Sequence, residues 1–487
     1  MHHAGRRCRP YLWLCALVAL LGAAHLVYSQ TLAFTWDEGF HLLASQLILA
    51  GKKPYLDFCF PQTTWNTYCV AACMWVFGQS WRVAHALQAL LTAGAVMLAV
   101  DFVYTRAPES RWRTPAAMAA ALLAGLNAVL LEHATVGQAY GMCLFAGVAA
   151  FRAAAAARGK QGMAFPLLAG FLAGMAAASS LLDAAVLPVL LGSFVLEKRW
   201  KSVAAFCAGA AMPFLPTLWL FVQAPGPAWF NLAGYQTHYR ITSYPDAGQH
   251  DFEVLSSWLD SGHALLLLLL AAAGWLAIRR GVEWRSAPRA EFYLAGALAA
   301  ALALEAAVAH PTFEQYFLLA VPFAAILAAA GFQGLCLRLA GSVRVGWPTG
   351  ILALLIVLGC GKSLYDRRDV YLWSEIEQVA GKVQQVTPPG APIWTDESIY
   401  FLTRRLPPSG MEFSYSHRIS DLKPELAAQL HIVPDAEIKR RVEAGTYATV
   451  ETCDLDTDFI DSLDLAKRYR QSSEMHDCGV YWDRAPR

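Results

Sequence analysis

Long apolar runs recur along the first three quarters of the chain, separated by shorter polar segments. A window of about 19 residues, the length of helix that crosses a bilayer, predicts eleven transmembrane helices. They are 11–30, 83–104, 115–131, 135–157, 163–180, 181–196, 202–222, 263–278, 290–308, 315–336 and 346–363. The two short runs between 163 and 196 are also consistent with a single re-entrant hairpin. The pattern therefore predicts a polytopic α-helical membrane protein.

The first polar segment, 31–82, begins with the pattern of an amphipathic helix. Thr35 and Glu38 have the spacing of a capping box, and Gly51 is a typical helix stop. Apolar side chains recur at helical intervals between these two signals: Trp36, Phe40, Leu43 and Leu47. We expect this helix to lie along the membrane surface rather than across the bilayer.

A polar stripe formed by Asp37, His41 and Ser45 is predicted on another face of the same helix, because residues four apart are neighbours. This stripe places a carboxylate at the boundary between membrane and water. A purely structural interpretation stays open, since Glu38 completes the capping box and Asp37 in the first turn complements the helix dipole.

The last part of the chain, 366–487, is predicted to form a small α/β domain, because its composition becomes polar and short strand and helix patterns alternate. The predicted helices are Trp373–Gln385, Asp421–Leu430 and Asp435–Ala444, and the predicted strands are Ala391–Thr395, Thr446–Glu451 and Val480–Asp483. The domain organisation expected is a membrane domain over 1–365, with outer loops at 31–82 and 223–262, followed by this domain.

Composition supports the membrane class. The 487 residues are 56% hydrophobic and only 15% charged, with a mean hydropathy of +0.37. A net charge of +1 excludes a large basic surface, so we expect no nucleic-acid partner. Most of the eleven cysteines lie in or beside apolar runs, whereas Cys453 and Cys478 lie in the polar terminal part, where a disulfide is chemically reasonable.

Basic residues set the predicted orientation. Loops on the N-terminal side of the predicted crossings contain seventeen Lys and Arg residues, whereas the opposite loops contain four. By the positive-inside rule the N-terminus is cytoplasmic, and an odd number of crossings places 366–487 on the periplasmic or extracellular side. The expected location is a cell membrane, with a bacterial inner membrane favoured.

Polar and ionisable residues gather at the predicted extracytoplasmic ends of the helices, where they are candidates for function. They are Asp37, Glu38, His41, Lys52, Lys53, Asp57, Glu132, His133, Asp183, His238, Arg240, Glu305, His310, Glu314, Gln315 and Tyr316. A single residue of this kind is commonly an interface residue, but two early carboxylates with basic residues on the same side favour a site.

Three sequence features resemble the GT-C-type glycosyltransferases of the dolichyl-phosphate-mannose protein mannosyltransferase and ArnT-like superfamily. They are WDEGFHLLASQLILAGKKPYLDF in the first loop, FGQSWRVAHALQALL after it, and HPTFEQYFLLAVPFAAILAAAGF at 310–332. With the pattern of crossings, the resemblance covers most of residues 11–365. It implies a GT-C-like transmembrane domain that transfers a sugar from a polyprenyl-phosphate donor to a hydroxyl, usually with inversion.

Under this resemblance, a carboxylate takes the proton of the acceptor hydroxyl and cations stabilise the leaving lipid phosphate. Asp37 is the expected base, Glu38 the residue that orients the acceptor, and Glu132 the second acidic residue that the family has in the next outer loop. The candidates for binding the donor phosphate are Lys52, Lys53, Arg240 and His310. The substrate pocket is expected to include His41, Asp57, Asp183, His238, Gln315 and Tyr316.

The chain departs from the family where it reads PQTTWNTY, since a proline-rich segment with a basic residue is usual there, and this shifts the expected phosphate contact to Lys52 or Lys53. No cofactor is expected and no metal is expected to be required, but a divalent metal shared by Asp37 and His41 or Glu132 stays open as an alternative. The acceptor class stays open among lipids, glycans and proteins. Two other functions are weighed: a transporter or flippase of lipid-linked sugars, which should show internal repeats and charges near the bilayer midplane, and a membrane-anchored binding protein.

Overall fold

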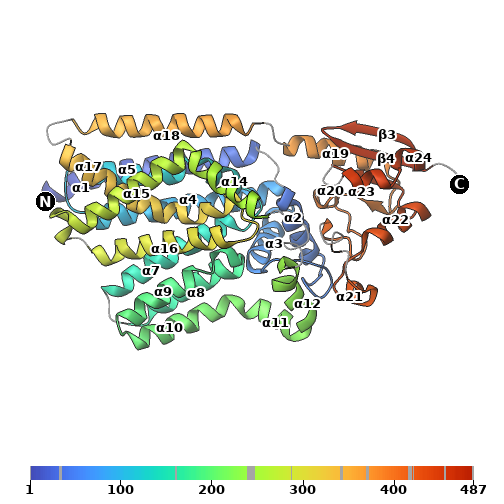
Figure 1. Ribbon diagram of the computed structural model, residues 1–487, viewed down its shortest axis with the longest axis horizontal. Coiled ribbons are helices and arrows are strands. Elements are labelled where there is room, and N and C mark those ends of the chain that lie inside the picture. The colour runs from blue at the N-terminus through green and yellow to red at the C-terminus, as the bar shows by residue number, and fades with distance from the viewer. Residues whose placement is uncertain are drawn as a thin grey trace. The chain divides into compact units, whose positions relative to one another are not determined.

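A computed structural model describes residues 2–31, 36–159, 162–237, 247–286, 288–339, 344–368, 372–414, 419, 422–453 and 457–484. Helices make up most of the chain, and a small sheet lies near the C-terminus (Figure 1). Contacts divide the chain into two compact units. The membrane unit contains Met1–Gln30, His85–Leu215 and Asp246–Asp369, and the sheet unit contains Thr31–Ala84, Pro216–Pro245 and Val370–Arg487.

The membrane unit consists of helices. They are α1 (His2–Thr31), α4 (Trp81–Arg106), α5 (Arg113–Gly125), α6 (Ala128–His133), α7 (Tyr140–Arg158), α8 (Ala164–Ser179), η1 (Leu181–Asp183), α9 (Val186–Leu196), α10 (Trp200–Ala211), η2 (Met212–Phe214), α14 (Ala247–Asp260), α15 (Gly262–Arg280), η4 (Glu283–Ser286), α16 (Arg289–Val308), η5 (Glu314–Ala320), α17 (Val321–Leu339) and α18 (Gly346–Asp366). The first four residues of α4 belong to the sheet unit.

Seven helices of the described chain are long and apolar enough to cross a membrane. An eighth crossing results if α14 and α15, which meet at a bend of 73°, form one span. The predicted polytopic helical fold is confirmed, but three predicted crossings differ in form. The run 115–131 is divided between α5 and α6, and the runs 163–180 and 181–196 are short apolar helices. Hydropathy alone does not reveal such breaks because the residues on both sides of a break are apolar.

The break between α5 and α6 has a local cause. The Asn127 side chain accepts a hydrogen bond from the Leu130 backbone N–H at 3.1 Å, which caps the start of α6. An Asn cap satisfies a helix N-terminus that would otherwise have no partner. The polar Asn127 within an apolar run is therefore the signal for the break.

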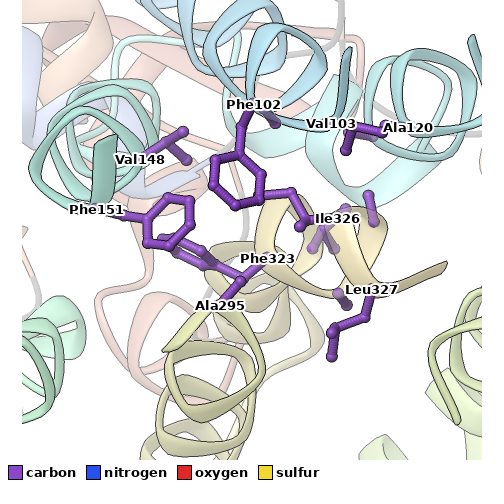
Figure 2. Packing of buried hydrophobic residues seen from close by; sticks show 14 of the residues in the cluster. Phe102, Val103, Ala120, Val148, Phe151, Ala295, Phe323, Ile326 and Leu327 are labelled. Atoms are coloured by element: carbon purple, nitrogen blue, oxygen red, sulfur yellow. The ribbon is translucent and has the colours of Figure 1, made fainter. Parts of the chain in front are cut away.

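Aromatic packing forms the centre of the membrane unit. The rings of Phe102 on α4 and Phe151 on α7 have centroids 4.8 Å apart, and Phe151 meets Phe323 on α17 edge to face at 5.9 Å. Figure 2 shows these rings together with Val148 and Ile326. Because α17 is buried almost throughout, it is the central helix of this unit.

Two glycines allow α15 and α17 to cross at very short range. A Cβ atom on Gly274 of α15 would lie 1.9 Å from the Leu327 carbonyl oxygen, and one on Gly331 of α17 would lie 2.0 Å from that of Leu270. Small residues permit such close approach of helices in membranes. The contact between these two helices therefore depends on the absence of side chains at both positions.

The sheet unit combines both predicted outer loops with the C-terminal part. Its helices are α2 (Trp36–Leu49), α3 (Trp65–Phe77), α11 (Leu215–Gln223), α12 (Pro225–Trp229), the π-helix η3 (Phe230–Gly234), α19 (Trp373–Val386), α20 (Glu397–Thr403), α21 (Pro424–Gln429), α22 (Asp435–Ala444), α23 (Thr457–Ser462) and α24 (Leu465–Arg468). Its strands are β1 (Ile393–Trp394), β2 (Thr449–Thr452), β3 (Tyr469–Met475) and β4 (Cys478–Arg484).

The four strands have the order β1-β2-β4-β3. β1 and β2 are parallel, whereas β2 pairs antiparallel with β4, and β4 pairs antiparallel with β3. The three predicted strands are present, but β3 was not predicted because its sequence YRQSSEM is mostly polar and exposed. It forms a hairpin with β4 through His476 and Asp477, both at positive φ, as a tight two-residue turn requires.

A disulfide joins Cys453, which follows β2, to Cys478 at the start of β4, across 25 residues of sequence. The bond connects two neighbouring strands, and it limits the conformations of the unfolded chain between them. The two cysteines of the polar terminal part are therefore paired, which the sequence alone did not decide.

Replacing Cys453 and Cys478 together by Ser is expected to lower the free energy of unfolding of the sheet by about 3 kcal/mol, the usual effect for a closed loop of this length. Thermal unfolding of the detergent-solubilised protein measures it. The single variants should lose as much as the double variant. A double variant with wild-type melting behaviour would show that the link adds no stability.

Candidate functional site

The helix α2 is the expected helix of the first loop. It runs Trp36–Leu49, and Gly51 follows at φ +84°, a conformation that favours glycine. Thr35, the expected capping residue, lies outside the described residues. The sequence pattern thus located the helix and its C-terminal end.

The prediction of an exposed polar stripe on this helix is wrong for two of its three residues, His41 and Ser45. Phe40, Leu43, His41 and Ser45 are all buried, and α2 packs against α3 and α20. The Ser45 hydroxyl donates a hydrogen bond to the His41 carbonyl at 3.0 Å. The periodicity of a helix shows which residues share a face, but not whether distant segments cover that face.

Asp37 differs from these buried residues of α2. Its side chain is exposed, and no group of the described residues donates a hydrogen bond to its carboxylate. Enough protein surrounds the carboxylate for desolvation to raise its pKa above the ordinary value. Asp37 therefore combines access to solvent with an increased affinity for a proton, which are the properties of a general base.

Glu38, its neighbour, is buried and engaged. A Glu38 carboxylate oxygen accepts a hydrogen bond from Trp373 Nε1 at 3.2 Å, and the Trp373 ring stacks on Trp81 at 4.9 Å. Trp81 in turn donates to Glu377 at 2.8 Å. Glu38 thus connects α2 to α19. The capping-box interpretation of Glu38 did not predict this contact.

His41 lies one turn after Asp37 and is enclosed by aromatic rings. Its ring stacks on Phe40 at 4.4 Å and meets Phe60 edge to face at 5.8 Å. Burial lowers the pKa of His41 to about 3, so the imidazole is neutral at physiological pH. Its Nδ1 has no hydrogen-bond partner among the described residues.

The lysines of the first loop lie on a turn after α2. Lys52 and Lys53 are exposed, and the Lys53 ammonium approaches Gln223 Oε1 at 3.4 Å. Asp57 belongs to the turn itself, because its carboxylate accepts the Lys53 backbone N–H at 2.7 Å. Two cations and Asp37 are therefore carried by the same short segment.

Glu412 from the C-terminal part is electrostatically coupled to Lys52. Burial raises the pKa of Glu412 to about 7, and the backbone N–H groups of the 410–412 segment and the Lys52 charge oppose this effect. The Gly410 N–H donates to its carboxylate at 2.7 Å. The next residue, Phe413, packs edge to face on Phe40 at 5.0 Å.

The long loop contacts the first loop within the sheet unit. The Phe60 N–H donates to the Asn231 side chain at 2.6 Å, and the hydroxyls of Thr64 and Thr217 lie 2.9 Å apart. His238 and Arg240, both expected at the site, lie outside the described residues.

Glu132, in the membrane unit, is paired with an arginine from far along the chain. The Arg367 guanidinium, just after α18, bridges Glu132 and Glu314 of η5. Ligand atoms of Glu132, His133 and Glu314 lie within 4.8 Å of one another, a spacing that suits a metal ion. Arg367 already supplies a positive charge there. Its ion pairs therefore hold the end of α18 against α6 and η5.

A second described cluster with metal-ligand atoms contains Glu451, Cys453 and Cys478. Its two cysteines form the disulfide, and a disulfide offers no thiolate to a metal. This cluster therefore does not fit a metal ion.

The other expected residues of the membrane unit are also engaged or enclosed. His310 Nδ1 lies 2.6 Å from an Asp251 carboxylate oxygen. Asp183 is buried between α8 and α9. Gln315 and Tyr316 lie in η5, where Gln315 is half-buried and Tyr316 is buried.

The structure thus brings six expected residues together in the sheet unit: Asp37, Glu38, His41, Lys52, Lys53 and Asp57. The membrane unit contains five others: Glu132, Asp183, His310, Gln315 and Tyr316. Sequence reasoning missed Trp373, Glu397, Glu412 and Phe413, which come from the C-terminal part and pack near α2 or its turn. No local motif marks these residues, so only a composition change near 366 pointed to the segment.

Comparisons with known proteins agree with this architecture. Residues 67–305 match the family model GT87: Glycosyltransferase family 87. No curated protein matches the chain. The crystal structure of ArnT from Cupriavidus metallidurans in the apo state is similar, with a TM-score of 0.66 at 15% identity, covering 96% of this chain and 97% of that one.

Two further solved structures are similar. ArnT from the same organism bound to undecaprenyl phosphate has a TM-score of 0.65 at 14% identity, covering 96% and 97% of the two chains. The archaeal oligosaccharyltransferase AglB from Archaeoglobus fulgidus, in complex with an inhibitory peptide and a dolichol-phosphate, has a TM-score of 0.52 at 15% identity, covering 92% of this chain and 70% of that one. The chain thus has the fold of these membrane proteins, and residues 67–305 resemble a glycosyltransferase family.

Proposed function

We propose that this protein is an inverting glycosyltransferase that moves a sugar from a polyprenyl-phosphate donor to a hydroxyl acceptor at the extracytoplasmic face of the membrane. One observation carries the proposal. Asp37 is an exposed carboxylate without a hydrogen-bond donor among the described residues, on a helix that is otherwise largely buried. A carboxylate held in this way is available to a substrate hydroxyl.

The reaction is a single displacement. Asp37 takes the proton of the acceptor hydroxyl while the acceptor oxygen forms a bond to the anomeric carbon. The bond between that carbon and the phosphate oxygen breaks, and its electron pair leaves with the lipid phosphate. Attack from the side opposite the leaving group inverts the anomeric configuration. The proton then passes from Asp37 to water, because the side chain is exposed.

The growing negative charge on the leaving phosphate requires cations. Lys52 and Lys53 lie on the same segment as Asp37 and are exposed. We assign the donor phosphate to these lysines, whereas Arg240 and His310 stay predictions from the sequence alone. This assignment suits the solved relatives, since one ArnT structure contains undecaprenyl phosphate and the AglB structure contains a dolichol-phosphate.

We propose that catalysis needs no metal ion. The two lysines supply positive charge for the leaving group, and Arg367 already supplies the positive charge between Glu132 and Glu314. The acceptor belongs to one of three classes: lipids, glycans or proteins.

The proposal is tested with the purified full chain in liposomes. Radiolabelled polyprenyl-phosphate hexoses and pentoses serve as donors, and a membrane extract supplies the acceptor. We expect release of polyprenyl phosphate and transfer of the label to a new product, both lost in Asp37→Asn and both unaffected by EDTA. Movement of intact donor across the bilayer without release would instead indicate a flippase. Activity that EDTA abolishes and a divalent ion restores would refute the metal-free mechanism.

A further inference from the structure

A groove lies on the exposed side of α18, at the beginning of this helix. Its volume is about 530 Å³. It is lined by six exposed residues: Arg344, Gly346, Trp347, Gly350, Ile351 and Leu354. The helix α18 lies along one edge of the membrane unit, and little of it is buried (Figure 1). Because α18 is long and apolar enough to cross a membrane, the surface that contains the groove faces lipid.

The space in the groove comes from two glycines one turn apart. A Cβ atom on Gly346 or Gly350 would meet no neighbouring segment within 4 Å. The side chains of Trp347, Ile351 and Leu354 recur at helical intervals beside them, so they form one apolar stripe. These three side chains are 68%, 56% and 58% exposed. No described segment therefore covers the stripe, and lipid is its neighbour in a membrane.

Arg344 supplies a positive charge at the polar end of the groove. It lies two residues before α18, its side chain is exposed, and its guanidinium has no ion-pair partner among the described residues. A guanidinium can donate two parallel hydrogen bonds to one phosphate group, which makes arginine well suited to bind phosphate. By the positive-inside rule this end of α18 is predicted to be cytoplasmic, where anionic lipids attract basic residues.

The groove has the depth of a single leaflet. From Gly346 to Leu354 the helix advances by eight residues, which is about 12 Å at about 1.5 Å per residue. Half of a hydrocarbon core of about 30 Å is about 15 Å. Trp347, near the polar end, is of the residue type that is enriched where membrane meets water. The groove therefore matches a molecule with an anionic head and an apolar chain that stays within one leaflet.

We propose that this groove binds an anionic phospholipid of the cytoplasmic leaflet, with the lipid phosphate on Arg344 and one acyl chain along Trp347, Ile351 and Leu354. A zwitterionic lipid also has a phosphate, but its ammonium group is repelled by the charge of Arg344. An apolar helix of another protein would cover the stripe but leave Arg344 without an anion. The site does not depend on the proposed transfer reaction, whose donor lipid is assigned to the opposite face of the membrane.

The test is native mass spectrometry of the detergent-purified full chain, titrated with phosphatidylglycerol or with phosphatidylcholine of the same acyl chains. We expect the wild type to bind one phosphatidylglycerol more tightly than phosphatidylcholine. Arg344→Gln is expected to weaken the binding of phosphatidylglycerol about fivefold, the usual effect of one basic residue beside an anionic lipid surface. Arg344→Lys should recover most of this loss, because it keeps the charge.

Lys201→Gln is the matched control for the loss of charge. Lys201 is exposed at the beginning of α10, on the same predicted side of the membrane, and Figure 1 shows α10 at the opposite edge of the membrane unit from α18. This variant should bind phosphatidylglycerol like the wild type. Gly350→Val tests the groove itself, since it places carbon atoms in the space and keeps every cation. We expect it to weaken the binding of phosphatidylglycerol as well.

Equal binding of the two lipids by the wild type would overturn the proposal, and so would equal affinities of folded Arg344→Gln and Lys201→Gln for phosphatidylglycerol. If Arg344→Gln does not fold, as judged by its melting temperature, wild-type affinity in Gly350→Val would overturn it instead. A lipid-free dimer that Gly350→Val converts to monomers would show that the groove holds a second copy of the chain. Tighter binding of a polyprenyl phosphate than of phosphatidylglycerol, lost in Arg344→Gln, would assign the groove to the donor lipid.

Discussion

Replacing Asp37 by Asn is expected to lower kcat for sugar transfer by about 10²- to 10⁴-fold, the usual contribution of a general base. Asn has the shape of Asp but cannot take the acceptor proton. The exposed position of the side chain and the absence of donors among the described residues mean that the substitution removes no described hydrogen bond. The loss should therefore appear in kcat, measured as lipid-phosphate release, while the melting temperature is unchanged.

The matched control is Asp464→Asn in the same unit. Asp464 is an exposed carboxylate paired with Lys467 at 2.7 Å, and it has a φ of +49°, which Asn tolerates as well as Asp. Loss of an exposed pair of this kind has little effect. We expect activity within about twofold of the wild type, because the ion pair of Asp464 and Lys467 is not part of the proposed site. Undiminished turnover in Asp37→Asn would exclude Asp37 as the base.

Replacing Gly274 by Val is expected to disrupt the membrane unit. The first carbon of the new side chain would lie 1.9 Å from the Leu327 carbonyl oxygen, which is backbone and cannot rotate away. Relief requires α15 and α17 to move apart, and α17 is the buried central helix. Overpacking in a core commonly costs about 1–3 kcal/mol. A contact with backbone at this range should exceed that, so we expect aggregation or a strongly lowered melting temperature.

Gly350→Val on α18 is the control for the loss of a glycine in a helix. A Cβ atom on Gly350 meets nothing within 4 Å, so this variant changes helix propensity and side-chain size without a collision. Its melting temperature should stay close to that of the wild type. Equal destabilisation of both variants would show that close crossing of α15 and α17 is not the cause. The measurement is size-exclusion chromatography after heating in detergent.

Several elements followed directly from local pattern. The helix Asp435–Ala444 has the bounds predicted for it, because an acidic first turn and a glycine stop are local signals. The strand Tyr469–Met475 has neither apolar alternation nor β-branched residues, since it is an exposed edge that depends on its partner β4. An edge strand of this kind is visible only after the hairpin has formed.

The site residues likewise include some that local sequence predicts and others that only packing brings together. Asp37, Lys52 and Lys53 could be proposed from one segment, because a helix pattern and a following turn place them. Glu132 was expected to act as a second acid, but its partner Arg367 lies 235 residues later. Glu397 packs against Gly39 of the same helix as Asp37, and no sequence motif predicts this contact. Contacts between residues so far apart depend on packing, and packing leaves no local signal.

The sequence by itself determined the class of the protein, most of its crossings, the helix Trp36–Leu49 and the carboxylate at its start, because hydropathy and helical periodicity are properties of neighbouring residues. Only the tertiary structure decided that this helix is largely buried, that Glu38 binds Trp373 and that Glu397 packs against Gly39. The reason is physical: burial and charge proximity arise when distant segments pack together, and they set the protonation that the proposed chemistry requires.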